Sequence, residues 1–238
     1  MAVDIEATDY FSGTFTNAAF FHPQSSSFEY ADEARNFLDA TGNVECETMV
    51  ATKQTYRTSY KYCNPTPAIG TDLGTALSTF GEYLAGPPTL VITSMTITFN
   101  AGDYAEVEIE GCNYYEDDGV TEVISADIGN SDVSAAVPAG AGFGVPELAG
   151  VTLGTDASPT SLTLTFNLDH KATEGADGFM FTTKNITPEV TASAEYVGVP
   201  TTIEPVTNWT TDSYENTDAN DDFDAASWNG HRYFDLAT

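Results

Sequence analysis

Residues 93–100 read TSMTITFN and residues 160–167 read TSLTLTFN, so an eight-residue stretch occurs twice with six identical positions. Both differences exchange one apolar residue for another. Apolar and polar residues therefore alternate in each copy, which is the pattern of a strand that buries one face. The stretch predicts two related strands in a β domain.

Each copy is followed by a second alternating run that ends in glycine. Residues 105–111 read AEVEIEG after the first copy, and residues 189–198 read EVTASAEYVG after the second. The repeated unit is therefore a pair of strands, over residues 93–111 and 160–198. Two copies are too few for a solenoid, so we expect pseudo-symmetric elements within one domain.

The rest of the chain divides around these units. We expect an N-terminal arm over residues 1–27, a β-sandwich domain over 28–200 and an acidic C-terminal extension over 201–238. Within the domain, residues 134–158 are rich in Ala, Gly, Val and Pro and predict a long loop. The predicted fold class is mainly β: an antiparallel β-sandwich or small barrel with one or two short flanking helices.

Two segments have the apolar spacing of short helices. The first covers residues 29–38, and Gly42 stands beyond its end. The second begins at Asp72, a good N-cap residue, and ends at Gly86. Its apolar side chains share one stripe: Leu73, Leu77, Phe80 and Leu84. We expect this stripe to pack on a sheet.

The charge of the chain is strongly negative. Seven Lys and Arg stand against 36 Asp and Glu, for a net charge of −29. Such a chain repels nucleic acid and anionic membranes at ordinary salt. Three explanations stay open: solubility at high salt, binding of divalent cations, and a surface that must not retain DNA.

Export and membrane signals are missing from the sequence. The first residues lack the basic segment and apolar core of a secretion signal, and no apolar run has the length of a membrane span. The three cysteines, an odd number, predict buried thiols. We expect neither a membrane nor nucleic acid as a specific partner.

The few basic residues are concentrated on one predicted strand. Lys53, Arg57 and Lys61 alternate with tyrosines and therefore share one strand face. One interpretation is a solvated face. The other is a docking face for the acidic surface of a neighbouring copy, because highly anionic copies associate only where charge is neutralised locally.

An acidic row follows the first repeated strand. Glu106, Glu108 and Glu110 lie on one face, while the apolar residues between them lie on the other. The row predicts either the acidic lining of a lumen or the solvent face of an ordinary antiparallel sheet.

A weak calcium candidate lies in the acidic extension, with oxygen ligands at alternate positions: Asp218, Asn220, Asp222 and Asp224. The EF-hand pattern fails there, because Phe223 replaces the required glycine and Asn229 stands in the place of the bidentate glutamate. We otherwise expect no metal and no cofactor.

Catalytic motifs are missing as well. The three histidines have no partner at metal or triad spacing, and no phosphate loop or nucleophile elbow occurs. With 36 acidic residues, some pair of carboxylates will be close in space by chance, so such a pair carries no information. We expect a protein that is not an enzyme.

The order of these segments resembles phage tail tube proteins and related virion structural proteins. The resemblance rests on DATGNV at residues 39–44, the Thr- and Tyr-rich strand, the short helix, TSMTITFN at 93–100 and VEIEG at 107–111, and it covers residues 28–198. In that family a β-sandwich or small barrel with one helix forms hexameric rings that stack into a tube.

The resemblance implies a homo-oligomer of hexameric rings with an acidic, DNA-conducting lumen. It also implies other virion proteins as partners, assembly in the host cytoplasm and a final location in the virion, without catalytic residues. Two alternatives stay open. One is a recognition module, an adhesin or carbohydrate-binding β-sandwich that uses Tyr and Trp side chains on a concave face; Trp209 and Trp228 favour a binding surface in the acidic C-terminal region. The other is a capsid or decoration protein.

Overall fold

The computed structural model describes residues 21–63, 83–84, 90–115, 122–123, 138, 143–148, 151, 157–174, 180–201, 209–218 and 224–233. Within these ranges the chain is mainly β and contains no helix, and each strand is antiparallel to its neighbours. The prediction of a mainly β, antiparallel fold is confirmed, and the architecture is compatible with a β-sandwich or barrel-like fold.

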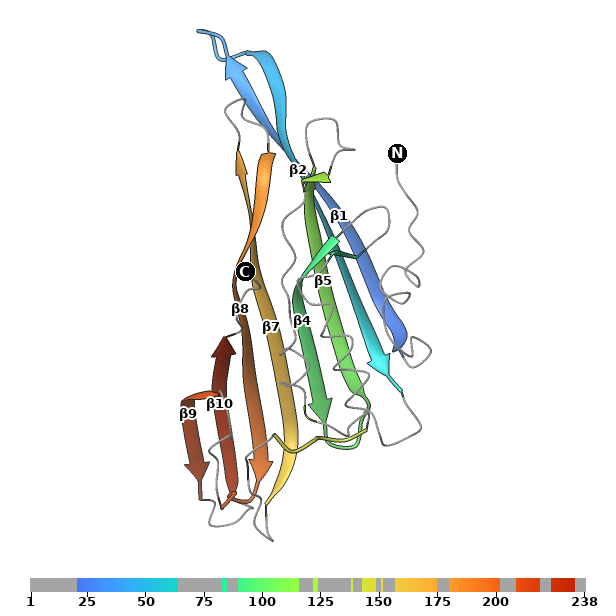
Figure 1. Ribbon diagram of the computed structural model, residues 1–238, viewed down its shortest axis with the longest axis vertical. Helices are drawn as coiled ribbons and strands as arrows, with labels where there is room; N and C mark the ends of the chain where they lie inside the picture. The colour runs from blue at the N-terminus through green and yellow to red at the C-terminus, as the bar shows by residue number, and fades with distance from the viewer. Residues whose placement is uncertain are drawn as a thin grey trace.

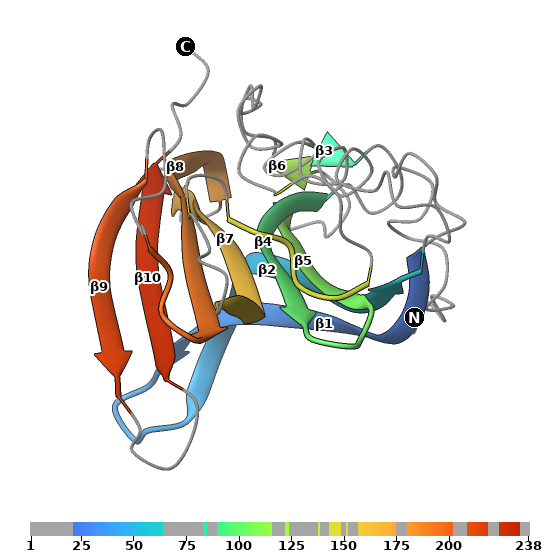
Figure 2. The same cartoon turned by 90° about the horizontal axis from the view of Figure 1, so that it is seen from below.

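The described strands form one curved, ten-stranded sheet (Figures 1 and 2). Their bounds are β1 Phe21–Leu38, β2 Val44–Tyr62, β3 Tyr83–Leu84, β4 Leu90–Asn100, β5 Ala105–Tyr115, β6 Glu122–Val123, β7 Ser158–Glu174, β8 Met180–Val197, β9 Thr210–Thr217 and β10 Ala225–Tyr233. The order is β1-β2-β5-β4-β7-β8-β10-β9, with β3 beside β4 and β6 beside β5. Among the described strands, β1 and β9 are the outermost, each with a neighbour on one side only.

The two copies of the repeated stretch are direct neighbours at the centre of the sheet. They lie in β4 and β7, and Ile97 stands opposite Leu164, the residue that corresponds to it in the second copy. The order β5-β4-β7-β8 places the partner hairpin strands symmetrically on either side. The two strand pairs are thus related by an approximate two-fold axis through the middle of the sheet.

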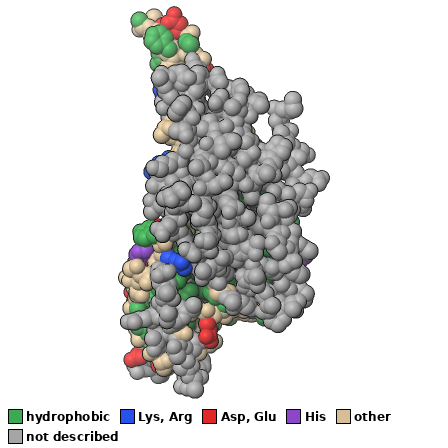
Figure 3. Space-filling model, in the orientation of Figure 1, with side chains coloured by type: hydrophobic (Ala, Val, Ile, Leu, Met, Phe, Trp, Pro, Cys, Tyr) green, Lys and Arg blue, Asp and Glu red, His purple; other side chains and the backbone are tan. Residues whose placement is uncertain are grey.

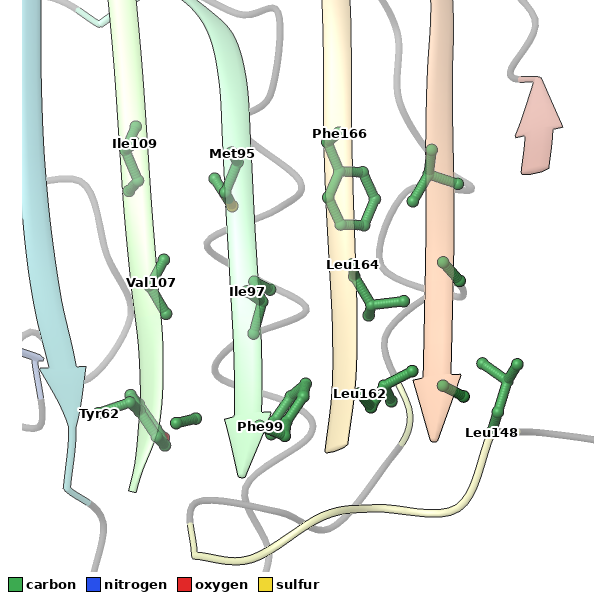
Figure 4. Close-up of a cluster of buried hydrophobic side chains, with 14 of the residues drawn as sticks. Tyr62, Met95, Ile97, Phe99, Val107, Ile109, Leu148, Leu162, Leu164 and Phe166 are labelled. Atoms are coloured by element: carbon green, nitrogen blue, oxygen red, sulfur yellow. The ribbon is translucent and has the colours of Figure 1, made fainter. Parts of the chain in front are cut away.

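The core lies on one face of this sheet (Figure 4). Alternate side chains of the central strands are buried there: Met95, Ile97, Phe99, Val107, Ile109, Leu162, Leu164, Phe166 and Val190. The parity predicted from the repeat is confirmed, because all nine residues belong to one cluster. Leu148 and Val151 add to the same cluster from a segment outside the strands.

The predicted helix over residues 29–38 is wrong, because these residues belong to β1 and pair with β2 along their whole length. Gly42, interpreted as the residue beyond a helix, instead has a φ of 87° in the turn between β1 and β2. The backbone of β1 is satisfied by a partner strand that the pattern of one segment cannot reveal. Of the second predicted helix, residues 72–82 and 85–86 lie outside the described residues, and Leu84 is in β3.

The expected segment boundaries fall within the sheet. β1 begins at Phe21 and runs through position 28, so residues 21–27 are part of the sheet. At the other end, β9 and β10 lie within residues 201–238, and β10 pairs with β8. Of the three cysteines, Cys112 alone is buried, while Cys46 is exposed and Cys63 is half-buried, so the prediction of buried thiols holds for Cys112 only.

Candidate functional site: the polar face of the sheet

The face opposite the core carries polar side chains without interruption from β2 to β10. We call this surface the polar face; its described members are Arg57, Ser59, Lys61, Ser94, Thr96, Thr98, Glu106, Glu108, Glu110, Ser161, Thr163, Thr165, Asn167, Glu189, Thr191, Ser193, Glu195, Ser227, Asn229 and His231. The alternation of each strand places them there, because their neighbours in sequence are buried in the core.

Strand register arranges the polar face in rows that cross the sheet. One row joins Lys61, Glu106, Thr98, Thr163, Ser193 and Asn229, and the next joins Ser59, Glu108, Thr96, Thr165, Thr191 and His231. The centre of each row consists of short hydroxyl side chains, which stack closely across strands. The polar face as a whole has five carboxylates against two cationic side chains.

The predicted acidic row and the predicted basic face lie side by side. Arg57 stands opposite Glu110 across the β2–β5 ladder, and Lys61 stands opposite Glu106. Lys61 Nζ lies 3.3 Å from Glu106 Oε1 and 3.2 Å from Asp103 Oδ2. The structure therefore brings both sets of predicted residues together in a single chain.

The Arg57 guanidinium bonds the Glu110 carboxylate through Nε and lies 4.0 Å from Glu29 through Nη1. The hydrogen bond that Arg57 donates to Glu110 raises the pKa of Arg57. The bonds to Asp103 and Glu106 raise the pKa of Lys61 in the same way. The Asp103 pKa is lowered, first by the backbone N–H of Tyr104 and then by Lys61. These cations already have acidic partners in their own chain.

Lys53 differs from the other two basic residues. Its ammonium lies 5.9 Å from the centre of the Tyr114 ring, within the range of a cation–π contact. Burial raises the pKa of the Tyr114 hydroxyl.

The acidic row faces solvent. Glu106 and Glu108 are exposed, and Glu110 is half-buried because Arg57 partly covers it.

Two hollows lie on the polar face. The larger, of about 380 Å³, spans β1, β2, β5 and β4 and is lined by side chains that include Ser25, Ser27, Ser59, Thr96 and Glu108. The smaller, of about 290 Å³, lies between β2, β5, β4 and β7. Its lining residues are Lys53, Thr93, Ser94, Glu110, Cys112, Asn167, Leu168 and Asp169. Both hollows offer hydrogen-bonding groups and carboxylates.

No protein-family model and no curated protein sequence matches this chain. Within the ranges that the structure describes, no helix is long and apolar enough to cross a membrane.

The calcium candidate is only partly described. Asp218 and Asp224 are exposed, whereas Asn220 and Asp222 lie outside the described residues. Among the residues with described positions, no group of three or more His, Cys, Asp or Glu side chains is arranged to hold a metal ion.

Sequence reasoning missed the hydroxyl rows of the polar face. Thr98 and Thr163 are adjacent only because β4 pairs with β7 in one register, and a single strand pattern does not contain that register. A second omission is the apolar tip of the β1–β2 hairpin, formed by Phe37, Leu38 and Val44. The signal for it was available, since these residues flank the turn-forming sequence DATGN at residues 39–43.

Proposed function

We propose that the protein is a virion structural subunit of the tail tube type, which assembles into stacked rings with the polar face toward a DNA-conducting lumen. The observation that carries the proposal is the uninterrupted polar face, backed over the same strands by a single core. Such a surface has few apolar groups with which to bind a passing polymer.

The electrostatics of the polar face support a lumen. Carboxylates outnumber cations there, and Arg57 and Lys61 are engaged by Glu110, Glu106 and Asp103. The polar face therefore repels the phosphate groups of DNA, and its described cations are already paired with carboxylates. A lining of this kind lets DNA slide without being retained.

The edges of the sheet support ring formation. β1 and β9 are different strands at opposite edges, and among the described strands each has a ladder partner on one side only. A contact between β1 of one copy and β9 of the next is heterologous, and repeated heterologous contacts close into a ring when the rotation allows it. We propose in addition that the rings are hexamers, that other virion proteins are partners and that assembly takes place in the host cytoplasm.

The test is negative-stain electron microscopy of the purified protein over a series of salt concentrations. The proposal expects rings or tubes, with more assembly as salt rises, since anionic copies must be screened before they can associate. Dispersed single copies at every salt concentration would contradict it. The polar-face substitution Glu106→Lys with Glu108→Lys gives a second readout, because it should make rings retain DNA that wild-type rings release.

A recognition module is the second candidate, favoured by the larger hollow with its serine and threonine hydroxyls. A sugar bound there would be held by hydrogen bonds and by Glu108. The expectation that Trp228 belongs to a binding surface is wrong, because its side chain is fully buried in the core. Trp209 packs edge-on against it. Retention of unassembled protein on immobilised glycans would favour the recognition module. Shells in micrographs would instead favour the third candidate, a capsid or decoration protein.

A further inference from the structure

The smaller of the two hollows extends past the members of the polar face to Lys53, a cation without a carboxylate partner among the described residues. It lies between β2, β5, β4 and β7, and Lys53 lines it as a half-buried side chain of β2. Among the described side chains, Arg57 and Lys171 each have a carboxylate within ion-pair distance, whereas Lys53 has none. Its ammonium contacts the Tyr114 ring instead, 5.9 Å from the ring centre.

An ammonium without a carboxylate partner stands out in this chain. Seven Lys and Arg stand against 36 Asp and Glu, so each cation has many possible partners. Among the described side chains on the face in Figure 3, Lys and Arg form only small, separate patches. A charge that is partly removed from water is costly unless an opposite charge accompanies it. The half-buried position of Lys53 in a hollow therefore favours an anionic ligand.

Two carboxylates also line the hollow, and each has a cation of its own. The Arg57 guanidinium bonds Glu110 through Nε, and Lys171 Nζ lies 2.6 Å from Asp169 Oδ2. Three cations thus stand against two carboxylates, which leaves one positive charge, that of Lys53. The hollow is locally positive on a chain whose net charge is −29.

The other groups that line the hollow are neutral, and two of them carry polar hydrogens. The Ser94 hydroxyl donates to Asn167 Oδ1 at 3.4 Å, which leaves the amide N–H groups of Asn167 as donors. Cys112 is buried, and burial raises the pKa of its thiol, so the thiol stays uncharged at ordinary pH. An ammonium beside amide donors is a suitable pair of groups for the oxygens of a carboxylate or a phosphate.

We infer that the smaller hollow binds a small free oxyanion, a carboxylate or inorganic phosphate, between Lys53 Nζ and the Asn167 amide. The inference goes beyond the proposed function and does not depend on it. A hollow of about 290 Å³ has room for such an ion and some of its water. A phosphate within DNA brings its neighbouring sugars and phosphates, which meet the carboxylates of the polar face outside the hollow. The lining therefore favours a free anion over nucleic acid.

The first experiment measures anion binding by NMR on unassembled protein at constant ionic strength. Because any salt screens a chain of charge −29, phosphate or acetate replaces chloride in the buffer instead of being added to it. The signals of the Ser94 backbone amide and the Asn167 side-chain amide should shift and saturate in the millimolar range. Saturation by one anion or by both supports the site and identifies the oxyanion. Signals that respond to neither anion would overturn the inference.

The second experiment uses substitutions to assign binding to the hollow. Lys53→Gln should weaken binding about tenfold or more, because it removes a charged donor. Arg35→Gln is the control: it removes the same charge from the β1–β2 hairpin and should change the affinity by about twofold or less, since distant exposed charges are screened. Equal losses in the two variants would mean a general charge effect and would overturn the inference.

Asp169→Asn gives a prediction of opposite sign. It removes a carboxylate that borders the hollow and leaves Lys171 without its partner, so binding of the anion should become several-fold stronger. A gain in affinity cannot result from misfolding, which protects this test from a damaged variant. Weaker binding in correctly folded Asp169→Asn would indicate a cationic or zwitterionic ligand and would overturn the inference.

A short single-stranded oligonucleotide tests the source of the anion. At the same concentration of phosphate groups it should shift the Ser94 and Asn167 signals less than inorganic phosphate does, because the carboxylates of the polar face repel it. Larger shifts with the oligonucleotide would overturn the inference of a free anion. They would also contradict a lumen that releases DNA, whereas loss of the anion site alone would leave the proposed rings unaffected.

Discussion

The two halves of β2 have similar alternating sequences and different surroundings. Residues 55–62 lie between β1 and β5, and Tyr56, Tyr60 and Tyr62 are at most 1% exposed. Residues 44–47 pair with β1 alone and are exposed on both faces. Burial along one strand thus changes completely within a few residues, because the neighbouring strand β5 ends its pairing at Thr52.

This difference shows what alternation means physically. An alternating pattern states that a strand has two unlike faces, but the apolar face is buried only where other elements cover it. In the sheet the apolar side chains of β2 stabilise the fold. At the apolar tip of the β1–β2 hairpin they stay exposed.

The sharpest test of this comparison is a pair of phenylalanine substitutions. Phe166→Ala should lower the free energy of unfolding by about 3–5 kcal/mol, because its ring is fully buried and leaves a cavity. Phe37→Ala at the tip should change it by less than about 0.5 kcal/mol. Denaturant melts of both variants in unassembled protein provide the measurement, and similar losses would mean that the tip is covered within its own chain.

Gly230→Ala, at the β9–β10 edge, should cause the next largest loss in the free energy of unfolding. A Cβ atom at Gly230 would lie 2.3 Å from the Trp228 ring and 2.6 Å from the carbonyl oxygen of Thr210. The buried indole must then move, at a cost of about 1–3 kcal/mol. Ser213→Ala, on exposed β9, is the matched control, and an unchanged melting transition for Gly230→Ala would show that Trp228 is not fixed in the core.

The Arg57–Glu110 ion pair should contribute less to the free energy of unfolding. The Arg57 side chain is 58% exposed and that of Glu110 30%, so a double-mutant cycle with Gln at each position should give about 0–1 kcal/mol. The coupling should shrink as salt screens the charges. A coupling energy that is larger and independent of salt would indicate that the pair is covered more than its exposure implies.

Replacing Lys53, Arg57 and Lys61 with Gln tests the predicted docking face. If these residues dock a neighbouring copy, the triple variant should lose assembly as measured by light scattering.

The smallest effect on overall stability should come from Asp39, since its turn belongs to the hairpin tip. Hydrogen bonds from Thr41 and Asn43 lower the pKa of Asp39 to about 2. A lowered pKa in the folded state means that the carboxylate stabilises the turn above its unfolded pKa of about 3.9, and that this contribution is lost as the pH falls through the folded value. NMR shifts of the Thr41 and Asn43 amides should titrate near pH 2, and Asp39→Ala should abolish that titration. A midpoint near 4 would contradict the turn geometry.

The sequence was sufficient for the local part of the fold. Hydrophobic alternation predicted which side chains of β4, β5 and β7 enter the core, because that choice depends on neighbouring positions in one strand. It could not predict that Ile97 lies opposite Leu164, or that Arg57 lies opposite Glu110, because register is set between segments far apart in the chain.

The error over residues 29–38 has the same origin. Helical spacing of a few apolar residues is compatible with a strand when a hairpin partner is available, and β2 supplies that partner. The candidate site was similarly predicted in pieces. Glu106, Glu108 and Glu110 were recognised as one row and Lys53, Arg57 and Lys61 as another, yet their adjacency in a single polar face required the sheet order.

The approximate two-fold axis between β4 and β7 also says something about the ancestry of the chain. Equivalent residues meet on the axis, and the partner strands follow, with Val107 beside Ile97 and Ala192 beside Leu164. An ancestral hairpin that paired edge-to-edge with an identical copy would have this geometry. Duplication and fusion of its gene would then join the two halves covalently and leave each free to diverge. In such a history the eight-residue stretch would lie at the seam between the two halves, where a change in one half must still fit the other.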